Sequence, residues 1–295
     1  MTKPKVTVGV CVRNCANLVE GAINSIKYQD FVQELMEVIF VDDGSNDNTL
    51  SVINSHVPQM KMQVRVFHQQ WRGIGAARNV VVDNARGDYI IWVDGDMRLP
   101  SEFVKKQVEY MEERPKVAIG KGKYGIYSGA SMVAYLENIE ELIDLLECEQ
   151  TSKSKPLGTG GSIYRVNVIR KVGGFSENAV GGGEDADAEF RIRKTGWLLQ
   201  LTPAEFFEMR RNNLKALWNE YFWHGSGGAS ILPAMKQTHS VLLKLFPPAA
   251  VLIEVLLSCT AYKLVHRKAV FLLPFHWIFK RVAWCVGFAM SYVNG

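Results

Sequence analysis

Two apolar runs that end in carboxylates constrain the fold of this chain more than any other feature. The first run, residues 37–41, leads into Asp43 and its neighbouring acid. The second run, residues 88–93, ends in the pair Asp94-x-Asp96. Short runs rich in β-branched and aromatic residues are typical of buried parallel strands, and ligands of open α/β sheets bind at the carboxyl ends of such strands. We therefore expect both acidic ends at one sheet edge, where the Asp-x-Asp pair can bind a divalent ion and, through it, a diphosphate.

The composition fits one large globular domain with an appendage. The chain has 295 residues, of which 47% are hydrophobic and 22% are charged. A net charge of +4 is mild, and we expect no nucleic-acid partner. The five cysteines are scattered without partners for a zinc site, so they are expected to be reduced thiols. The polar N-terminus predicts no signal peptide.

Strand and helix signals alternate along the first 115 residues. This β-α-β-α order predicts a doubly wound, mostly parallel α/β sheet. Beyond Pro115 the pattern is less regular, with a long helix at 130–149 and a helix at 186–195. The expected strands are residues 5–12, 37–41, 64–67, 89–93, 117–122, 163–166 and 197–202.

The C-terminal tail combines apolar and basic residues. Its apolar segments, 246–265 and 269–293, are interrupted by charges, so neither is a clean span of about 20 uncharged residues. Such segments favour interfacial or re-entrant helices on an anionic membrane surface. The alternative is that they pack on the globular domain or on a second subunit.

Several short motifs occur over residues 5–228. They are Val6–Asn14, Val41-Asp42-Asp43-Gly44-Ser45-x-Asp47-x-Thr49, Gly73-x-Gly75-Ala76-Ala77-Arg78-Asn79, Asp94-Gly95-Asp96, Gly173-Gly174-Phe175 and Glu184-Asp185. In their order and spacing they resemble the motifs of family 2 glycosyltransferases. The resemblance implies a GT-A fold, to which the tail adds C-terminal apolar helices. It also implies a UDP- or GDP-linked sugar donor, Mg²⁺ or Mn²⁺, and inverting, hexosyltransferase-like transfer.

The same resemblance implies the roles of the site residues. It assigns the catalytic base to Asp185, direct metal binding to Asp96 and an indirect metal contact to Asp94. The remaining donor-binding residues are Cys11, Arg13, Asp43 and Arg78, and the acceptor side holds Gly160, Gly161 and Glu184. Arg78 also begins a predicted helix after a glycine-rich turn, a position that favours anions.

The chain departs from processive members of the family, because it has no Gln-x-x-Arg-Trp motif. A segment rich in aromatic residues and glycine, Tyr221–Gly228, occupies that part of the sequence instead. This difference favours transfer of a single sugar. His224 is a candidate further metal ligand on a glycine-hinged lid.

The predicted organisation has three parts. Residues 1–212 form the catalytic domain, with a nucleotide-sugar half at 1–115 and an acceptor half at 116–212. Residues 213–241 form a lid or connector, and residues 242–295 form membrane-associating helices.

Three functional hypotheses remain open at this point. The first is a peripheral or monotopic transferase at the cytoplasmic face of the cell membrane, with a lipid-linked or glycan acceptor. The second is a soluble transferase acting on polysaccharide or protein, whose tail makes a homodimer. The third is a non-catalytic GT-A-like scaffold. A nucleotidyltransferase is disfavoured, because residues 14–20 lack its glycine-rich, basic phosphate loop.

Overall fold

The structure is a computed structural model that describes residues 3–125, 131–151, 156–177, 183–231 and 247–294. Its contacts divide the chain into two compact units. Among the described residues, the first unit holds 3–125, 156–177 and 183–208, and the second holds 131–151, 209–231 and 247–294.

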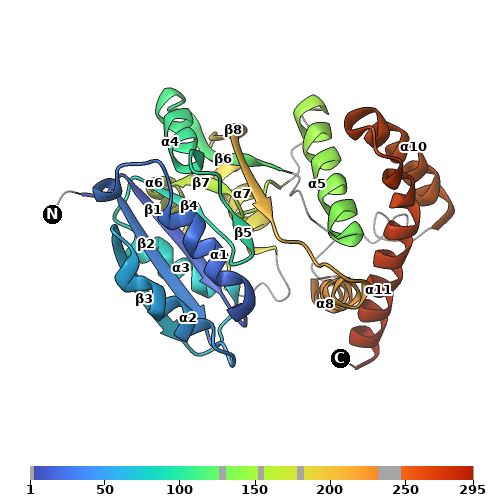
Figure 1. Ribbon diagram of the computed structural model, residues 1–295, viewed down its shortest axis with the longest axis horizontal. Helices are drawn as coiled ribbons and strands as arrows, with labels where there is room; N and C mark the ends of the chain where they lie inside the picture. Colours follow the sequence, from blue (N-terminus) through green and yellow to red (C-terminus); the bar gives the residue numbers. More distant parts are fainter. Residues whose placement is uncertain (1–2, 126–130, 152–155, 178–182, 232–246, 295) are drawn as a thin grey trace. The chain divides into compact units, whose positions relative to one another are not determined.

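The first unit is built on an eight-stranded, mostly parallel sheet, which confirms the predicted fold class (Figure 1). Its strand order is β3-β2-β1-β4-β7-β6-β8-β5. Strands β1 to β4 are parallel to their neighbours within that group, whereas β7 is antiparallel to both β4 and β6. The strands are β1 Val6–Val12, β2 Met36–Asp43, β3 Gln63–Gln69, β4 Tyr89–Trp92, β5 Met97–Arg98, β6 Val117–Tyr124, β7 Ser162–Arg165 and β8 Leu198–Glu208.

Helices cover both faces of this sheet. One hydrophobic cluster joins the sheet to α1, α2 and α4, and another joins it to α3, α6 and α7. The helices are α1 Ala16–Lys27, α2 Thr49–His56, α3 Ile74–Asn84, α4 Phe103–Glu113, α6 Val166–Lys171 and α7 Glu184–Lys194, with short 3₁₀ turns η1 Gln33–Leu35 and η2 Val57–Gln59.

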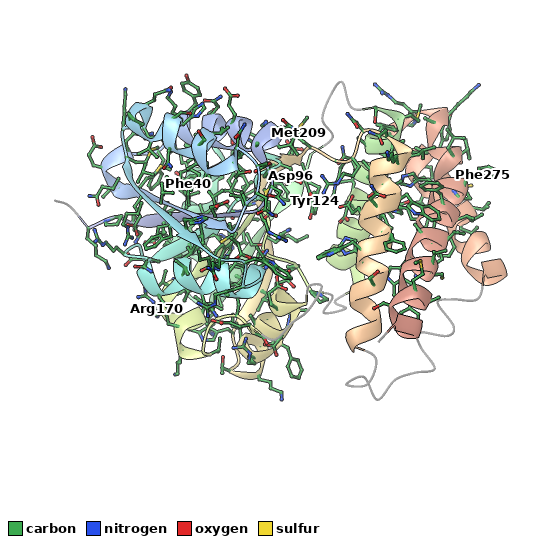
Figure 2. All side chains as sticks on the ribbon, turned by 90° about the horizontal axis from the view of Figure 1, so that it is seen from below. Phe40, Asp96, Tyr124, Arg170, Met209 and Phe275 are labelled. Carbon is green, nitrogen blue, oxygen red and sulfur yellow. The ribbon has the colours of Figure 1, made fainter. Side chains whose placement is uncertain are left out.

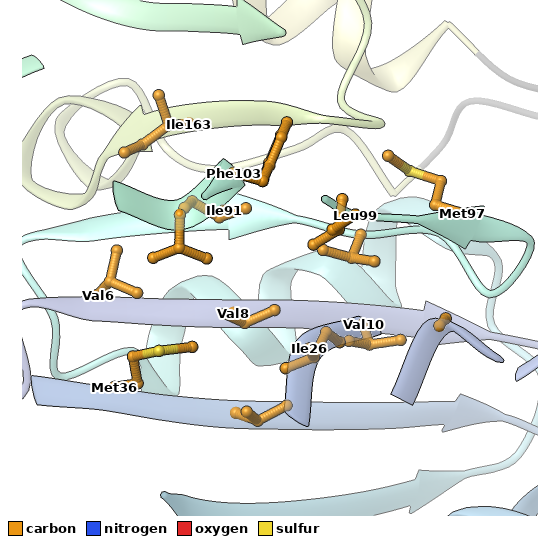
Figure 3. Packing of buried hydrophobic residues seen from close by; sticks show 14 of the residues in the cluster. Val6, Val8, Val10, Ile26, Met36, Ile91, Met97, Leu99, Phe103 and Ile163 are labelled. Atoms are coloured by element: carbon orange, nitrogen blue, oxygen red, sulfur yellow. The ribbon is translucent and has the colours of Figure 1, made fainter. Parts of the chain in front are cut away.

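Strand β1 is the centre of the packing. All seven of its residues are buried, because it lies between β2 and β4 and both of its faces are covered. Val6, Val8 and Val10 point to the same side, where they join Ile26 and Phe103 in the first cluster (Figure 3). The continuous apolar run in the sequence therefore reports a strand buried on both faces.

The structure adds elements that the sequence did not predict. Strand β2 continues to Asp43, so this acid is the last residue of the strand. The two-residue strand β5 follows Asp96 and pairs antiparallel with the end of β8. The long β8 extends six residues beyond the predicted end at Thr202.

The second unit consists of helices. They are α5 Met132–Thr151, α8 Leu214–Ile231, α10 Pro247–Val265, η4 Lys268–Leu272 and α11 Leu273–Asn294. Buried apolar residues of α5, α10, η4 and α11 form its hydrophobic cluster. Within the described chain, only the segment Lys268–Ser291 has the length and apolar composition needed to cross a membrane. The segment predicted to be a lid contains the continuous helix α8, and its residues 232–241 lie outside the described ones.

Helices α8 and α11 touch backbone to backbone through glycine. A Cβ atom at Gly287 would overlap the carbonyl oxygen of Phe222, and one at Gly225 would overlap the carbonyl oxygen of Trp284. Small residues permit this close approach between helices. The glycine in the middle of α8 is therefore a packing position.

We expect Gly287→Ala to destabilise the protein by about 1–3 kcal/mol, because the new methyl group meets backbone atoms that cannot move aside. Helix propensity alone predicts the opposite sign, a gain of about 1 kcal/mol. Urea unfolding followed by tryptophan fluorescence measures the difference. The reverse substitution Ala289→Gly, at an exposed position of α11, should cost only the propensity of about 1 kcal/mol. A more stable Gly287→Ala protein would contradict the close crossing.

Candidate functional site

The two acidic strand ends meet beside the centre of the sheet, as the sequence predicted. Cys11, near the end of β1, lies next to Val41 of β2 in the strand register. Burial raises the pKa of the Cys11 thiol to about 12, and the carboxylates of Asp94 and Asp43 add to this rise against the opposing charge of Arg78. Cys11 is thus a neutral thiol, and it lies close enough to Asp43 and Asp94 for their charges to affect its pKa. Asp96 lies at the carboxyl-terminal edge of the sheet and Arg170 at the opposite edge (Figure 2).

Asp43 organises the loop that follows β3. Its Oδ1 accepts hydrogen bonds from Gln69 Nε2 at 2.7 Å and from the backbone N–H of Arg72 at 2.9 Å. Its Oδ2 accepts the N–H of Gly73 at 3.0 Å. The adjacent Asp42 is fully buried and binds His68 Nδ1 at 2.7 Å. Both acids therefore shape the edge of the sheet, and Asp43 is held in a single orientation there.

An exposed aromatic residue lies in the loop that Asp43 holds. Trp71 is 65% exposed, and the guanidinium carbon of Arg13 lies 4.8 Å from the centre of its ring. Nε of Arg13 also reaches the carbonyl oxygen of Gly44 at 3.5 Å. Arg13 therefore lies beside this acidic edge, as predicted, and forms a cation–π pair there.

The Asp94-x-Asp96 turn is tight and packed against a second loop. A Cβ atom on Gly95 would come within 2.6 Å of Cys15 Sγ, so the central residue has no room for a side chain. A Cβ atom on Gly160 would lie 2.5 Å from Asp94 Oδ2. Gly161 adopts a φ of +69° and donates its N–H to the carbonyl of Trp92 at 2.9 Å. The glycines predicted for the acceptor side thus line one flank of Asp94.

The other end of that glycine loop reaches Asp185. The Cβ position of Gly158 lies 3.7 Å from Asp185 Oδ2 and 3.9 Å from Lys121 Nζ. Lys121 is buried and donates a hydrogen bond to the carbonyl oxygen of Gly160. Glu189 of α7 accepts the N–H of Gly158 at 2.8 Å, and burial raises the pKa of this carboxyl. Residues 158–160 therefore connect Asp94 to Asp185.

A buried ion pair joins α3 to the start of α7. Arg78 Nη1 contacts Glu184 Oε1, and both residues are less than one-tenth exposed. Burial alone would lower the pKa of Arg78, but the carboxylates of Glu184, Asp94 and Asp185 outweigh it and raise the pKa. The Oε2 atom of Glu184 is buried without a hydrogen-bond partner among the described residues. Arg78 is thus the cation among the three acids, and its described ion-pair partner is Glu184.

The motif at residues 73–79 and the motif at residues 173–175 are hydrogen-bonded to each other. The side-chain oxygen of Asn79 accepts the N–H of Phe175 at 2.8 Å, and its amide nitrogen donates to the Phe175 carbonyl at 2.9 Å. Gly174, with a φ of +70°, leaves the space that Asn79 needs. The ring of Phe175 in turn packs edge-on against Trp92 at the end of β4. These contacts fix α3 against the strand that carries Asp94.

The chemistry of the Asp94-x-Asp96 turn fits a hard divalent cation. The pair supplies carboxylate oxygens from one turn beside a glycine loop, which is the ligand type that Mg²⁺ and Mn²⁺ prefer. The helical unit holds a second group of possible metal ligands, whose candidate ligand atoms lie within 4.8 Å of one another. Its members are Glu137, Glu140 and His276. There, however, Nζ of Lys280 donates to both carboxylates, at 2.6 Å in the case of Glu137. This ammonium already supplies the positive charge, so the helical cluster is an internal ion network.

His224 lies on α8 in the second unit, where its ring contacts the rings of Tyr221 and Trp223. These contacts do not test the metal-binding role of His224, which stays a prediction.

Two arginines of the same unit form ion pairs there. Arg210 pairs with Glu141 at 3.5 Å, and Arg211 pairs with Glu220 at 3.1 Å.

A cavity of about 840 Å³ opens at the opposite edge of the sheet, away from the acids. Its basic side chains are largely occupied by the fold itself. Arg170 binds the carbonyl oxygens of Val82 and Ala85 at the end of α3, and Arg165 binds that of Met111 in the last turn of α4. Positive charge at the C-terminal end of a helix is stabilising in itself. This cavity is a structural feature of the first unit.

Three residues around the acids were not predicted as site residues. Lys121 carried a signal, because a lysine that directly follows an apolar run in a strand must find a partner when it is buried. Glu189 gave no comparable signal, because it is one acid among several on α7. Trp71 gave none either, since single exposed aromatic residues are common in loops.

Comparisons with known proteins give consistent results. Residues 7–173 match the family model described as glycosyl transferase family 2. The fold is similar to that of the mannosyltransferase PcManGT from Pyrobaculum calidifontis, solved with GDP-Man and Mn²⁺, with a TM-score of 0.65 at 18% identity over 99% of this chain and 88% of that one. It is also similar to Staphylococcus aureus TarS residues 1–349 with UDP-GlcNAc, with a TM-score of 0.55 at 17% identity over 99% and 92% of the two chains.

Two curated relatives are longer than this chain. The poly(ribitol-phosphate) β-N-acetylglucosaminyltransferase TarS of Staphylococcus aureus is 29% identical over 109 residues, which is 37% of this chain and 19% of TarS. The glycosyltransferase GlyA of Streptococcus pneumoniae is 23% identical over 264 residues, which is 83% of this chain and 35% of GlyA. The chain thus spans only a fifth to a third of these relatives.

We expect Arg78→Met to destabilise the protein by about 3–5 kcal/mol, because it leaves the carboxylate of Glu184 buried without its cation. Arg72→Met is the matched control, since its ion pair with Glu177 is exposed and should be worth less than about 1 kcal/mol. Urea unfolding of the two variants measures both values. Equal losses would contradict the central role of the buried pair.

Proposed function

The chain belongs to glycosyl transferase family 2, and on that basis we propose that it moves one sugar from a nucleotide-diphosphate sugar to an acceptor with inversion at the anomeric carbon. The observation that carries this proposal is the glycine loop that connects Asp94 to Asp185. One carboxylate belongs to the donor side and the other to the acceptor side. A single-displacement transfer requires two such groups on either side of one reacting carbon.

In this proposal the donor binds to the nucleotide-sugar half of the catalytic domain, residues 1–115. Asp43 accepts an N–H of the base, while Cys11 and Arg13 flank it, and Arg78 contributes positive charge beside the phosphates. Support comes from the position of these residues at one sheet edge and from the cation–π pair of Arg13 with Trp71. UDP- and GDP-linked sugars are both candidates, because the solved relatives were obtained with UDP-GlcNAc and with GDP-Man.

Asp96 and, indirectly, Asp94 would hold Mg²⁺ or Mn²⁺. When bound, such an ion neutralises the charge that develops on the departing diphosphate. The carboxylate chemistry of the turn and the Mn²⁺ in the mannosyltransferase structure support this assignment. His224 stays a candidate further ligand.

The acceptor binds in the half formed by residues 116–212, beside Gly160 and Gly161. As its hydroxyl oxygen bonds to the anomeric carbon, the hydroxyl proton passes to the carboxylate of Asp185. The bond between that carbon and the diphosphate breaks, and its electron pair leaves with the diphosphate. Glu184 is paired with Arg78 and holds the first turn of α7, so its contribution is to orient Asp185. With a phosphate acceptor, whose oxygen is already ionised, Asp185 would serve to position the acceptor.

The proposed acceptor is lipid-linked or a glycan, and the proposed location is the cytoplasmic face of the cell membrane. The C-terminal helices, residues 242–295 in the predicted organisation, would attach the protein in a peripheral or monotopic way. The apolar segment Lys268–Ser291 and the excess of basic residues in the tail support this location.

We expect Asp185→Asn to abolish sugar transfer while nucleotide binding in the presence of Mn²⁺ is retained, because the base acts on the acceptor. Asp96→Ala should abolish both transfer and metal-dependent donor binding. Asp187→Asn is the matched control, since Asp187 lies on the same helix but pairs with Arg191 at 2.7 Å, and it should keep activity within about twofold. Donor turnover with a panel of nucleotide sugars measures these effects. Full activity in Asp96→Ala would overturn the proposed donor site.

Removal of divalent ions with a chelator should reduce the thermal stabilisation that a nucleoside diphosphate gives. A ligand that binds only the folded state raises the melting temperature, and the rise is larger for a tighter ligand. A thermal-shift screen of UDP and GDP, with and without Mg²⁺ or Mn²⁺, measures this dependence. A shift that is the same without metal would argue against an ion at Asp96.

A further inference from the structure

Helix α11 buries two polar side chains and exposes a row of apolar ones. His276 and Lys280 are only 6% and 7% exposed, whereas Phe275, directly before His276, is 71% exposed. Figure 2 labels Phe275 on this helix. Water-soluble proteins usually show the opposite pattern, with the apolar stripe of a helix facing the core. This arrangement needs a solvent or a partner that accepts an apolar surface.

The exposed apolar residues of α11 form one continuous stripe, which we name the α11 stripe. At 100° per residue they fall within an arc of about 120°, and at 1.5 Å per residue they extend over about 22 Å of the helix. The members of the α11 stripe are Phe275, Ile278, Val282, Val286 and Met290. Such a stripe is a continuous surface along the helix and differs from the single exposed apolar residues that any protein carries.

The two buried polar side chains of α11 bind carboxylates of their own unit. Lys280 donates to Glu137 and Glu140 of α5, and His276 Nδ1 lies 3.1 Å from Glu140 Oε1. This network lies in the first third of α11, near the middle of the apolar segment Lys268–Ser291. A helix that crossed the hydrocarbon core would carry these charges and their partners on α5 into it, which is costly. The helix therefore suits a position along a membrane surface, with only its stripe in contact with lipid.

The turn that joins the end of α10 to η4, ahead of α11, is basic. Lys263, Arg267 and Lys268 are exposed there, together with His266. The sequence contains no acidic residue after Glu254, so no carboxylate of the tail offsets this charge. Anionic lipid surfaces attract such clusters by about 1 kcal/mol per basic residue near the headgroups. The charge of the turn is thus complementary to an anionic bilayer.

We propose that the α11 stripe and this basic turn together bind the surface of an anionic lipid bilayer, with α11 lying along it. The stripe contacts the acyl-chain boundary, and the turn contacts the headgroups. The proposal deepens the membrane location in the proposed function and rests on that part of it. It uses no donor or acceptor residue.

Vesicle flotation of the full-length protein, without nucleotide, tests the proposal. We expect the wild-type protein to float with phosphatidylglycerol-containing vesicles and far less with pure phosphatidylcholine. Ile278→Glu combined with Val282→Glu should reduce the bound fraction at least tenfold. Arg267→Glu combined with Lys268→Glu should remove the preference for phosphatidylglycerol. Tyr28→Glu combined with Val32→Glu, at exposed apolar positions of the first unit, should bind like wild type.

Three results would overturn the proposal. The wild-type protein does not float with either vesicle, or the stripe variant floats as well as wild type. The third such result is a wild-type protein that is a dimer and does not float, together with a monomeric Ile278→Glu, Val282→Glu variant. That result would make the α11 stripe an interface between two copies of the chain. Urea midpoints establish that the variants are folded, and donor turnover in solution reports on the proposed transferase separately. Turnover without flotation refutes only the membrane surface, and flotation without turnover refutes only the enzyme.

Discussion

The buried guanidinium of Arg78 is the interaction on which the acidic site depends. Glu184, Asp94 and Asp185 all act electrostatically on this one cation, and it forms a direct ion pair with Glu184. Without it, Glu184 would be a buried carboxylate with no cation beside two further acids. The next residue in the chain, Asn79, fixes the same helix to the backbone of Phe175. Two adjacent side chains of α3 thus fix this helix to the Gly174-Phe175 loop and to the helix that carries Asp185.

The sequence predicted the sheet and its acidic edge because the signals there are local. Apolar runs such as those of β1 and β2 indicate buried strands, and parallel strands place their carboxyl ends together. The pairing of Arg78 with Glu184 had no local signal, since 106 positions separate the two residues. The two-residue strand β5 is too short for any periodic pattern.

Helix α8 shows why composition misled in the second unit. Its glycines suggested a hinge, because glycine is a poor helix former. In the structure Gly225 lies inside a continuous helix and meets the backbone of α11, so tertiary packing outweighs propensity. Only the position of the partner helix, about 60 residues further along the chain, explains the choice of residue. The apolar outer face of α11 was likewise invisible until the structure separated its buried from its exposed residues.

The three hydrogen bonds of Asp43 have a consequence for any ligand that meets this edge. Because Gln69, Arg72 and Gly73 already hold the carboxylate, its rotational freedom is lost when the protein folds. A ligand that contacts Asp43 then does not have to order it, and the same bonds keep the adjoining loop in place. The entropy cost of ordering the Asp43 side chain is therefore met during folding, so ligand binding at this edge does not carry it.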